Sequence, residues 1–444
     1  MTTPCIRLII LLGLLPLTIY SFAQPAELNA KQWAAELSKK HYSADESFRK
    51  LSVTLANRDS VRVFQFINEL AEEGKSNSYY FQARFNCLKA GMINVKSLYY
   101  EFYQDRKPVD VNSLKKEIMN LLASAIDIAY RSEDDYLIAF VSYTYSITVN
   151  QLGETALTVM YAKNAIDLYE KLSYPILPNA YQFLAEKLYQ VREYDECIKY
   201  AKKSVIAWRQ SPEEYKPFTI SSMNTVALGY HRQKNYDSAM IFYGQALDYA
   251  KQTRDTLWAG IVLGNMGQLF YVQGKYDTAY SLLISDYKAS KERGYFDNAA
   301  NSLQWAAKTN LAKGNKATAL AEVREAAQLL GVWPDANYLR NAYYTTAQVF
   351  REMGNYDSAF YYTNLYVALN DSLERVIAAS SLAISKARLN DETSRYRIQT
   401  LNREKRSQLM LRNVIIAGVV ILSLLALAML NRKRLKTKLE KEKI

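Results

Sequence analysis

The sequence contains little histidine and little cysteine, with two histidines and three cysteines among 444 residues. Neither His41 nor His231 has Cys, Asp or Glu neighbours at a spacing typical of metal ligands, so we expect no His/Cys metal site. Cys5 lies in the N-terminal segment before an apolar stretch, and Cys87 and Cys197 are far apart in the chain. We expect Cys87 and Cys197 to be buried free thiols, with a disulfide between them as the alternative.

The sequence also lacks the usual catalytic motifs. It has no G-x-S-x-G segment, and Gly274-Lys275 resembles the end of a phosphate-binding loop only superficially. Such a loop needs glycine at position 269, which is Leu269, and Ser or Thr after the lysine, where this chain has Tyr276. We therefore expect neither an enzyme nor a bound cofactor.

Net positive charge is low in most of the chain, although the formal net charge of the whole sequence is +12. The segment 403–412 contributes +3, the last 14 residues contribute +5 and Arg7 adds one, which leaves +3 for the remainder. A nearly neutral body argues against a nucleic-acid partner. The 36 tyrosines could stack on single-stranded nucleic acid, but their recurrence at packing positions favours a structural role.

A repeat is the main feature of the sequence. The hexapeptides KNYDSA, GKYDTA, GNKATA and GNYDSA end at Ala239, Ala279, Ala319 and Ala359, which are 40 residues apart. A constant period of this length is typical of a solenoid of stacked supersecondary units. Two earlier copies, ending at Cys197 and Thr158, complete six units.

The spacing of apolar residues predicts two helices joined by a short turn in each unit. In the fourth unit, apolar residues recur at steps of three and four up to Phe270, and the same spacing resumes from Tyr276. Gly274 can adopt the positive φ that ends a helix, and Asp277 suits the first turn of the next. The small Ala279 allows the two helix backbones to approach closely.

These residues resemble the tetratricopeptide repeat family. The fourth unit matches its pattern of small and aromatic positions with Gly267, Phe270, Gly274, Tyr276 and Ala279. The third unit matches with Ala227, Tyr230, Tyr236, Ala239, Tyr243 and Ala246, and the sixth with Ala347, Phe350, Gly354, Tyr356 and Ala359.

The units also depart from the family pattern. The usual repeat has 34 residues and a terminal proline, and here Lys316 replaces an aromatic residue in the fifth unit. The resemblance implies an all-α, TPR-like α-solenoid of antiparallel helix pairs with a period of about 40 residues. We expect each helix to be about one turn longer than usual.

The ends of the chain predict export and a membrane anchor. Residues 1–23 have the charge, apolar run and small-residue cleavage site of a signal peptide. Residues 413–431 form an uncharged apolar run that is followed by Arg-Lys-Arg. The basic flank places the C-terminus in the cytoplasm and the repeats in the periplasm, with one span in the inner membrane.

Six segments follow from this pattern. We expect a signal peptide at 1–23, degenerate helical capping pairs at 24–132, six TPR-like repeats at 133–370, a coiled-coil-like stalk helix at 371–412, a transmembrane helix at 413–431 and a basic cytoplasmic tail at 432–444. A heptad-like apolar stripe from Tyr366 to Ala387 fits either homodimerisation through the stalk or packing against the solenoid.

In the tetratricopeptide family, peptides or partner helices bind the concave face, so the resemblance implies a protein or peptide ligand. The residues that fall on this face are Gln182, Glu186, Tyr189, Asn224, His231, Gln268, Tyr271, Gln304, Lys308, Tyr344, Gln348 and Arg351. The family's paired Lys and Asn set for a carboxylate tail is not matched.

The whole layout is similar to the sensory half of bacterial membrane-anchored sensor histidine kinases and regulators, ending after the transmembrane helix. We therefore expect a periplasmic binding or sensing module without catalytic output of its own, which signals through a cytoplasmic partner. The alternative is a structural scaffold for an envelope protein assembly.

Overall fold

The computed structural model describes residues 28–40, 43–74, 78–97, 110–174, 177–210, 216–330 and 335–441. The predicted signal peptide lies outside these residues. The described residues form α-helices with short connections and no β-strand, which confirms the predicted fold class. The chain divides into two compact units, the first ending at Leu382 and the second beginning at Ala383.

The first unit begins with five helices that share one apolar core with the helices that follow. They are α2 (Ala30–Leu37), α3 (Ser43–Ala56), α4 (Ser60–Glu73), α5 (Tyr79–Met92) and α6 (Val111–Arg131). Helices α5 and α6 pack as a pair, whereas α3 and α4 pack mainly on α2 and α5. The capping role of this region stays a prediction.

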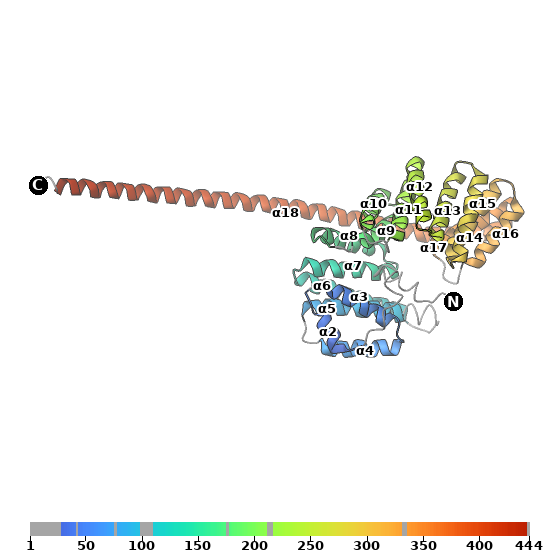
Figure 1. Ribbon diagram of the computed structural model, residues 1–444, viewed down its shortest axis with the longest axis horizontal. Helices are drawn as coiled ribbons and strands as arrows, with labels where there is room; N and C mark the ends of the chain where they lie inside the picture. Colours follow the sequence, from blue (N-terminus) through green and yellow to red (C-terminus); the bar gives the residue numbers. More distant parts are fainter. Residues whose placement is uncertain are drawn as a thin grey trace. The chain divides into compact units, whose positions relative to one another are not determined.

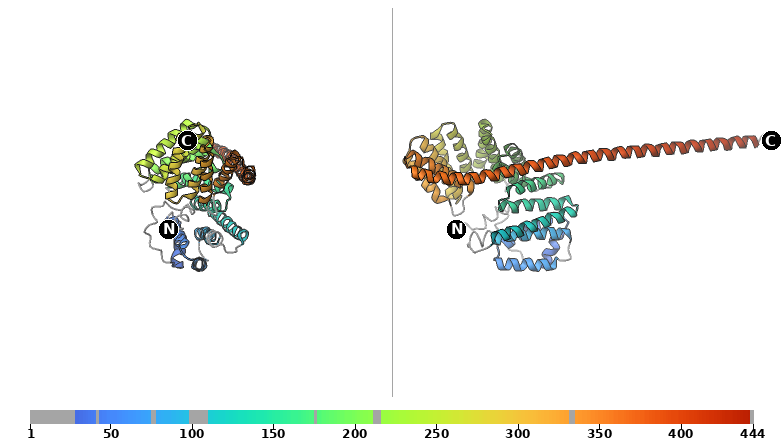
Figure 2. Two further views of the ribbon diagram at one scale, coloured as in Figure 1. Left: turned by 90° about the vertical axis from the view of Figure 1, so that its right-hand side faces the viewer. Right: turned by 180° about the vertical axis from the view of Figure 1, so that it is seen from behind.

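Six helix pairs follow in chain order (Figure 1). The pairs are α7 (Asp135–Gln151) with α8 (Thr155–Lys171), α9 (Leu177–Gln190) with α10 (Tyr194–Arg209), α11 (Lys216–Arg232) with α12 (Tyr236–Gln252), α13 (Thr256–Val272) with α14 (Tyr276–Glu292), α15 (Phe296–Ala312) with α16 (Lys316–Leu329), and α17 (Ala336–Glu352) with α18 (Tyr356–Lys441). Figure 2 shows the same helices from two further sides.

The length of the helices explains the 40-residue period. Helices α13 and α14 have 17 residues each, and three-residue turns separate them from each other and from α15. The turn residues at Gly274, Gly314 and Gly354 have φ values of 75°, 83° and 78°. Lys234 adopts the same left-handed conformation with φ 62°, although a side chain makes it less favourable than glycine.

The fourth pair has an unusually close approach between its helices. A Cβ atom added at Gly264 of α13 would lie 2.1 Å from Asp286 Oδ2 on α14. Asp286 itself is buried and replaces the alanine found at the same repeat position in Ala246 and Ala326. A glycine on one helix thus provides the space for a carboxylate on the other.

The array curves, with the first helix of each pair on the inner side. From α9 to α17, the first helices of neighbouring pairs contact one another, whereas contacts between the second helices are sparse in the described residues. The charge of Asp335 at the start of α17 also acts on Lys187 of α9, four pairs earlier. Such curvature is usual in helical repeats and produces an extended binding surface.

The beginning of α18 closes this curve. Glu374 forms an ion pair with Arg192 in the turn between α9 and α10, and the Ser381 hydroxyl donates to the Val191 carbonyl at 3.4 Å. Tyr366 lies against Tyr344 of α17, and Ser380 is buried. The first part of the heptad-like stripe therefore packs against the solenoid, which favours this alternative over a dimer contact.

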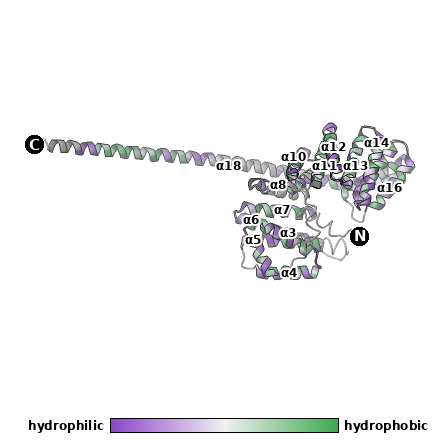
Figure 3. Ribbon diagram, viewed as in Figure 1, coloured by the Kyte–Doolittle hydropathy of each residue, from purple (hydrophilic) through white to green (hydrophobic). Residues whose placement is uncertain are grey.

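The second unit contains the rest of the 86-residue helix α18. One helical segment of the described chain, Arg406–Arg434, is long and apolar enough to cross a membrane by its length and composition. Large apolar side chains between Leu409 and Leu430 are exposed. Figure 3 shows the hydropathy of each residue along the helix.

Candidate functional site on the inner face

We define the inner face as the side-chain surface of the first helices α9, α11, α13, α15 and α17. The sequence assigned twelve residues to this face, and the structure places all of them on these five helices. Their environments differ. Gln182, Asn224 and Gln304 are buried, whereas Glu186, Tyr344 and Arg351 are exposed and the others are half-buried.

The first group of these residues lies between α9 and α11. The Gln182 side-chain amide donates to Glu186 Oε1 at 2.8 Å and lies 3.0 Å from Thr225 Oγ1. Burial raises the pKa of Glu186, although its side chain is accessible to solvent. A carboxylate that is both accessible and surrounded by protein is consistent with a position on the concave side of the array.

Amide side chains continue this surface. Asn265 on α13 donates to the Asn224 side-chain oxygen at 2.9 Å, and Gln268 lies 3.4 Å from Asn265. Gln304 is 1% exposed, and neither polar atom of its amide has a hydrogen-bond partner among the described residues. Gln182 also has a buried side-chain oxygen without a partner there. Unpaired buried amide atoms are costly to the fold.

Aromatic rings gather around Lys308. Its ammonium lies 4.3 Å from the centre of the Trp305 ring and 5.3 Å from that of Tyr344. Tyr271 packs edge-on against Trp305 at 5.5 Å, and Gln348 donates to the Tyr344 hydroxyl at 3.1 Å. Three neighbouring first helices therefore contribute to one aromatic cluster.

Two predicted residues do not join these groups. The imidazole of His231 lies 3.3 Å from the Tyr243 hydroxyl and also packs against Tyr236, so it contacts α12 within its own pair. Burial and the neighbouring Arg232 lower the pKa of His231 to about 4. Arg351 is exposed, and its nearest acidic partner is Glu352 at 3.9 Å.

The sequence analysis missed several residues of this face. Arg232, next to His231, donates to the Tyr189 hydroxyl at 2.7 Å. Arg340 on α17 and Arg232 on α11 both act electrostatically on Lys308 of α15. Burial, together with these two charges, lowers the pKa of Lys308 to about 8. Their positions follow from the curvature of the array, which the repeat period alone does not specify.

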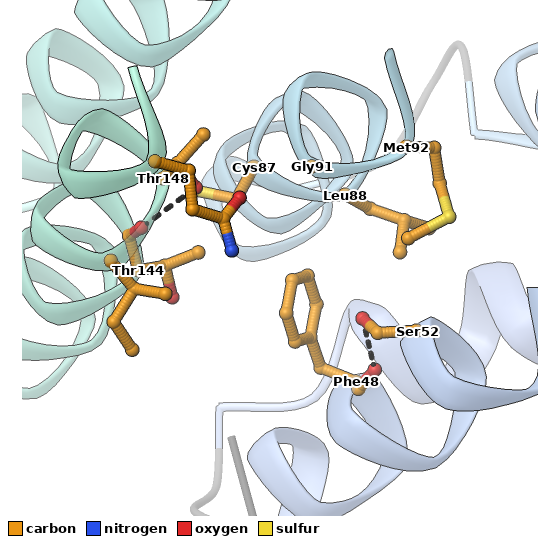
Figure 4. Close-up of a pocket in the computed structure, with 10 residues that line it drawn as sticks. Phe48, Ser52, Cys87, Leu88, Gly91, Met92, Thr144 and Thr148 are labelled. Carbon is orange, nitrogen blue, oxygen red and sulfur yellow. Dashed lines mark hydrogen bonds between the residues drawn. The ribbon is translucent and has the colours of Figure 1, made fainter. Parts of the chain in front are cut away.

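A small cavity lies elsewhere, between α3, α5 and α7 (Figure 4). It has room for about one water molecule. The hydroxyls of Ser52 and Thr148 donate to carbonyls of their own helices, at 2.8 Å and 2.9 Å. Burial raises the pKa of the Cys87 thiol in its wall to about 12. This cavity is therefore a packing defect of the N-terminal core and offers little to a ligand.

Both cysteines of the described chain, Cys87 and Cys197, are buried and free, as predicted. Across the residues that the structure covers, no group of three His, Cys, Asp or Glu side chains is arranged to hold a metal ion.

Comparisons with known proteins bear on the fold of the repeats. Residues 177–252, which form α9 to α12, match the tetratricopeptide repeat family. No curated protein sequence matches the chain. The apo form of RapI is 14% identical and has a TM-score of 0.50, with 66% of this chain and 99% of that chain covered. This likeness shows a common fold.

Two further crystal structures are similar at lower scores. A Rap protein complexed with Competence and Sporulation Factor is 14% identical, covers 78% of this chain and 100% of that chain, and has a TM-score of 0.48. Aspartyl phosphate phosphatase F from Bacillus subtilis is 11% identical, covers 83% of this chain and 96% of that chain, and has a TM-score of 0.45.

Proposed function

We propose that this protein is a binding module that holds a protein or peptide on the inner face of its TPR-like solenoid. The observation that carries the proposal is the composition of this face. Five helices from successive pairs bring together hydrogen-bonding amides, half-exposed aromatic rings and cations. Aromatic rings and hydrogen-bonding side chains on a curved, preformed surface are typical of peptide recognition.

We further propose that a membrane anchors this module and that it senses its ligand in the periplasm. The exposed apolar side chains of Arg406–Arg434 support the anchor, because water would otherwise contact all of them. The basic residues after this segment support a cytoplasmic C-terminus. In this arrangement the solenoid detects a ligand outside the cytoplasm, and a separate partner produces the response.

Peptide selection tests the binding function. Random dodecapeptides are displayed and selected on the full-length protein in detergent micelles, and the affinity of recovered peptides is measured by fluorescence anisotropy. We expect Tyr344→Ser to weaken binding at least about tenfold, as is usual for an aromatic contact at the centre of an interface. Tyr295→Ser is the matched control. Tyr295 is 44% exposed and Tyr344 is 40% exposed, and Tyr295 lies in a turn outside the inner face. Equal losses for both variants, or no selected peptide, would refute the proposal.

Carbonate extraction of cell membranes tests the anchor. We expect the full-length protein to stay in the membrane pellet. Replacement of Leu422 and Leu425 by arginine should release it, since each charge at the centre of a span costs about 3 kcal/mol. A full-length protein that carbonate extracts into the soluble fraction would contradict the anchor. Reporter fusions at the C-terminus then test the orientation. A reporter that is active only in the periplasm, fused to the C-terminus, would contradict a cytoplasmic C-terminus if it were active.

A further inference from the structure

The second helix of a repeat pair has one side that packs on the following pair. On α14, the Tyr280 hydroxyl donates to Glu322 Oε1 at 3.0 Å, and the Tyr287 hydroxyl donates to Glu325. Both glutamates lie on α16, which is the second helix of the next pair. This side of a second helix is therefore a contact by which one pair holds the next.

The centre of this contact is buried in the inner pairs and open in the last one. Leu283 on α14 packs with Ala306 of the next pair, and Val323 on α16 packs with Val349 of the pair after that. Leu283 is fully buried and Val323 is 3% exposed. The same repeat position on α18 is Thr363, which is exposed. The last pair of the array thus leaves uncovered a surface that its predecessors bury.

The uncovered residues form one uncharged row along α18, which we call the open stripe. Its residues are Tyr356, Phe360, Thr363 and Val367. Their spacing of four, three and four residues is that of a seam between two helices. Phe360 is 70% exposed, although an aromatic ring of this size usually gains stability from burial. Tyr366, which packs on Tyr344, lies about a quarter turn away around the helix, so the open stripe is separate from the side of α18 that packs on the solenoid.

The open stripe lacks the hydroxyls with which α14 holds the next pair. Phe360 occupies the repeat position of Tyr280, and Val367 occupies that of Tyr287. Neither side chain can donate to a glutamate, so the stripe does not suit another pair of the same kind. An uncharged row at this spacing suits the same row of a second copy, because apolar side chains then pack on one another and no like charges meet across the two-fold axis.

The continuity of α18 favours a second copy of this chain as the partner. The helix runs without a break from the open stripe into the apolar segment Arg406–Arg434. Two copies that this segment anchors in one membrane present α18 in the same direction and the stripe at the same height. A two-fold axis along the membrane normal then places each residue of the stripe opposite its counterpart. Confinement to one membrane also raises the effective concentration of the two copies.

We infer that the open stripe binds the open stripe of a second copy, so that the protein forms a parallel dimer through the first turns of α18. This inference goes beyond the proposed binding function, and its parallel geometry rests on the proposed anchor. The contact is made by Phe360 and Val367 together with their neighbours in the stripe. It leaves free the side of α18 that packs on the solenoid, so the dimer needs no change in the fold of either copy.

Cysteine cross-linking of the full-length protein in cell membranes tests the inference. Thr363→Cys places a thiol in the open stripe, and Ser372→Cys places one on the opposite side of α18, nine residues further on. Both side chains are exposed, which makes the second variant a matched control. We expect mild oxidation to join two copies of Thr363→Cys through residue 363, as mass spectrometry of the linked peptide shows. Ser372→Cys and the wild type should stay unlinked, since Cys87 and Cys197 are buried.

Opposite charges at one position test whether the two stripes face each other. Phe360→Glu and Phe360→Lys, each combined with Thr363→Cys, should lower the yield of linked dimer at least about tenfold, because two like charges then meet in an apolar contact. Co-expression of the two variants should restore the yield. Ile241→Glu is the control, since Ile241 is an exposed apolar residue of α12, and it should leave the yield unchanged. Circular dichroism of each purified variant checks that it is folded.

Three results would overturn the inference. The first is a Thr363→Cys protein that stays unlinked or links no better than Ser372→Cys. The second is a link to a different protein, which would assign the stripe to another partner. The third is a yield that the Phe360 variants do not change, which would place the contact elsewhere. The proposed function is tested separately, because peptide selection and carbonate extraction use the protein with an intact stripe. A protein that carbonate releases but that still links through residue 363 would refute the anchor and keep the dimer.

Discussion

The N-terminal core and the inner face both hold charges away from bulk water, but they do so in different ways. In the core, Arg84 is fully buried, pairs with Asp45 at 3.4 Å and donates to the carbonyls of Leu37 and Lys39 at 3.0 and 2.8 Å. Tyr174 and Tyr136 donate to the same aspartate. On the inner face, Arg232 donates to the Tyr189 hydroxyl and Lys308 lies over the Trp305 ring, and neither cation has a carboxylate within 4.0 Å among the described residues. The core thus pairs its buried cation with a carboxylate, although Arg84 Nε has no partner in the described chain, whereas the inner face surrounds its cations with aromatic groups.

The largest effect should come from breaking the buried pair of Arg84 and Asp45. We expect Arg84→Met to lower the free energy of unfolding by about 3–5 kcal/mol, because it leaves Asp45 buried without its cation. Burial already raises the pKa of Asp45, against the opposing effects of Arg84 and the two tyrosines. Urea unfolding of the full-length protein, followed by circular dichroism at constant detergent, measures the change. The double variant Asp45→Asn/Arg84→Met should recover part of the loss, and a single variant as stable as the wild type would show that the pair is dispensable.

Asp286 is an intermediate case, because it is buried with hydrogen-bond donors but forms no ion pair with a cation in the part of the chain that the structure describes. Ser290 and Asn298 each donate to it at 2.9 Å, and Ser302 donates as well. Burial raises its pKa from 3.8 to about 6 despite these donors. The folded state thus holds a proton that the unfolded chain releases between pH 4 and 6, so this contribution to stability is present below about pH 4 and is lost as the pH rises through 6.

We expect the wild type to lose about 2 kcal/mol relative to Asp286→Asn as the pH rises from 4 to 6, because folding raises the pKa of Asp286 from 3.8 to about 6. Urea unfolding of both proteins at several pH values measures the difference. If the free energy of unfolding changed with pH in the same way for both proteins, the raised pKa of Asp286 would be contradicted.

The smallest effect should come from an exposed pair. Lys163 and Asp167 lie 3.1 Å apart on α8 with their side chains 35% and 43% exposed. Lys163→Met should change the free energy of unfolding by less than about 0.5 kcal/mol, as is usual for such pairs. A change as large as that of Arg84→Met, in the same urea experiment, would remove the distinction between the two classes of charge.

The fold could be predicted from the sequence because its determinants are local. Helix length, the residues with positive φ at the turns and the small side chains between paired helices all recur with the repeat, and each acts within one unit. The site was less predictable. Its residues were chosen from their position along each first helix, which identified Lys308, Tyr344 and Tyr271 but not Arg232, Arg340 or Trp305.

The missing residues depend on how far each repeat turns relative to the next, and no short segment encodes this angle. His231 shows the same limit, because its ring turns to Tyr243 while the adjacent Arg232 reaches Tyr189. The contact in which Gly264 makes room for the Asp286 carboxylate was also not evident from the repeat pattern. The domain boundaries and the ligand contacts of the twelve chosen residues stay predictions.

The contact of Glu374 with Arg192 has a consequence for how this protein can change in length. Helical repeats generally tolerate the gain or loss of whole units, because each unit packs only on its neighbours. Here an inserted or deleted block of 40 residues would carry Glu374 one helix pair away from Arg192 and leave both side chains unmatched. The contacts between α18 and the turn that joins α9 to α10 are thus matched to an array of this length.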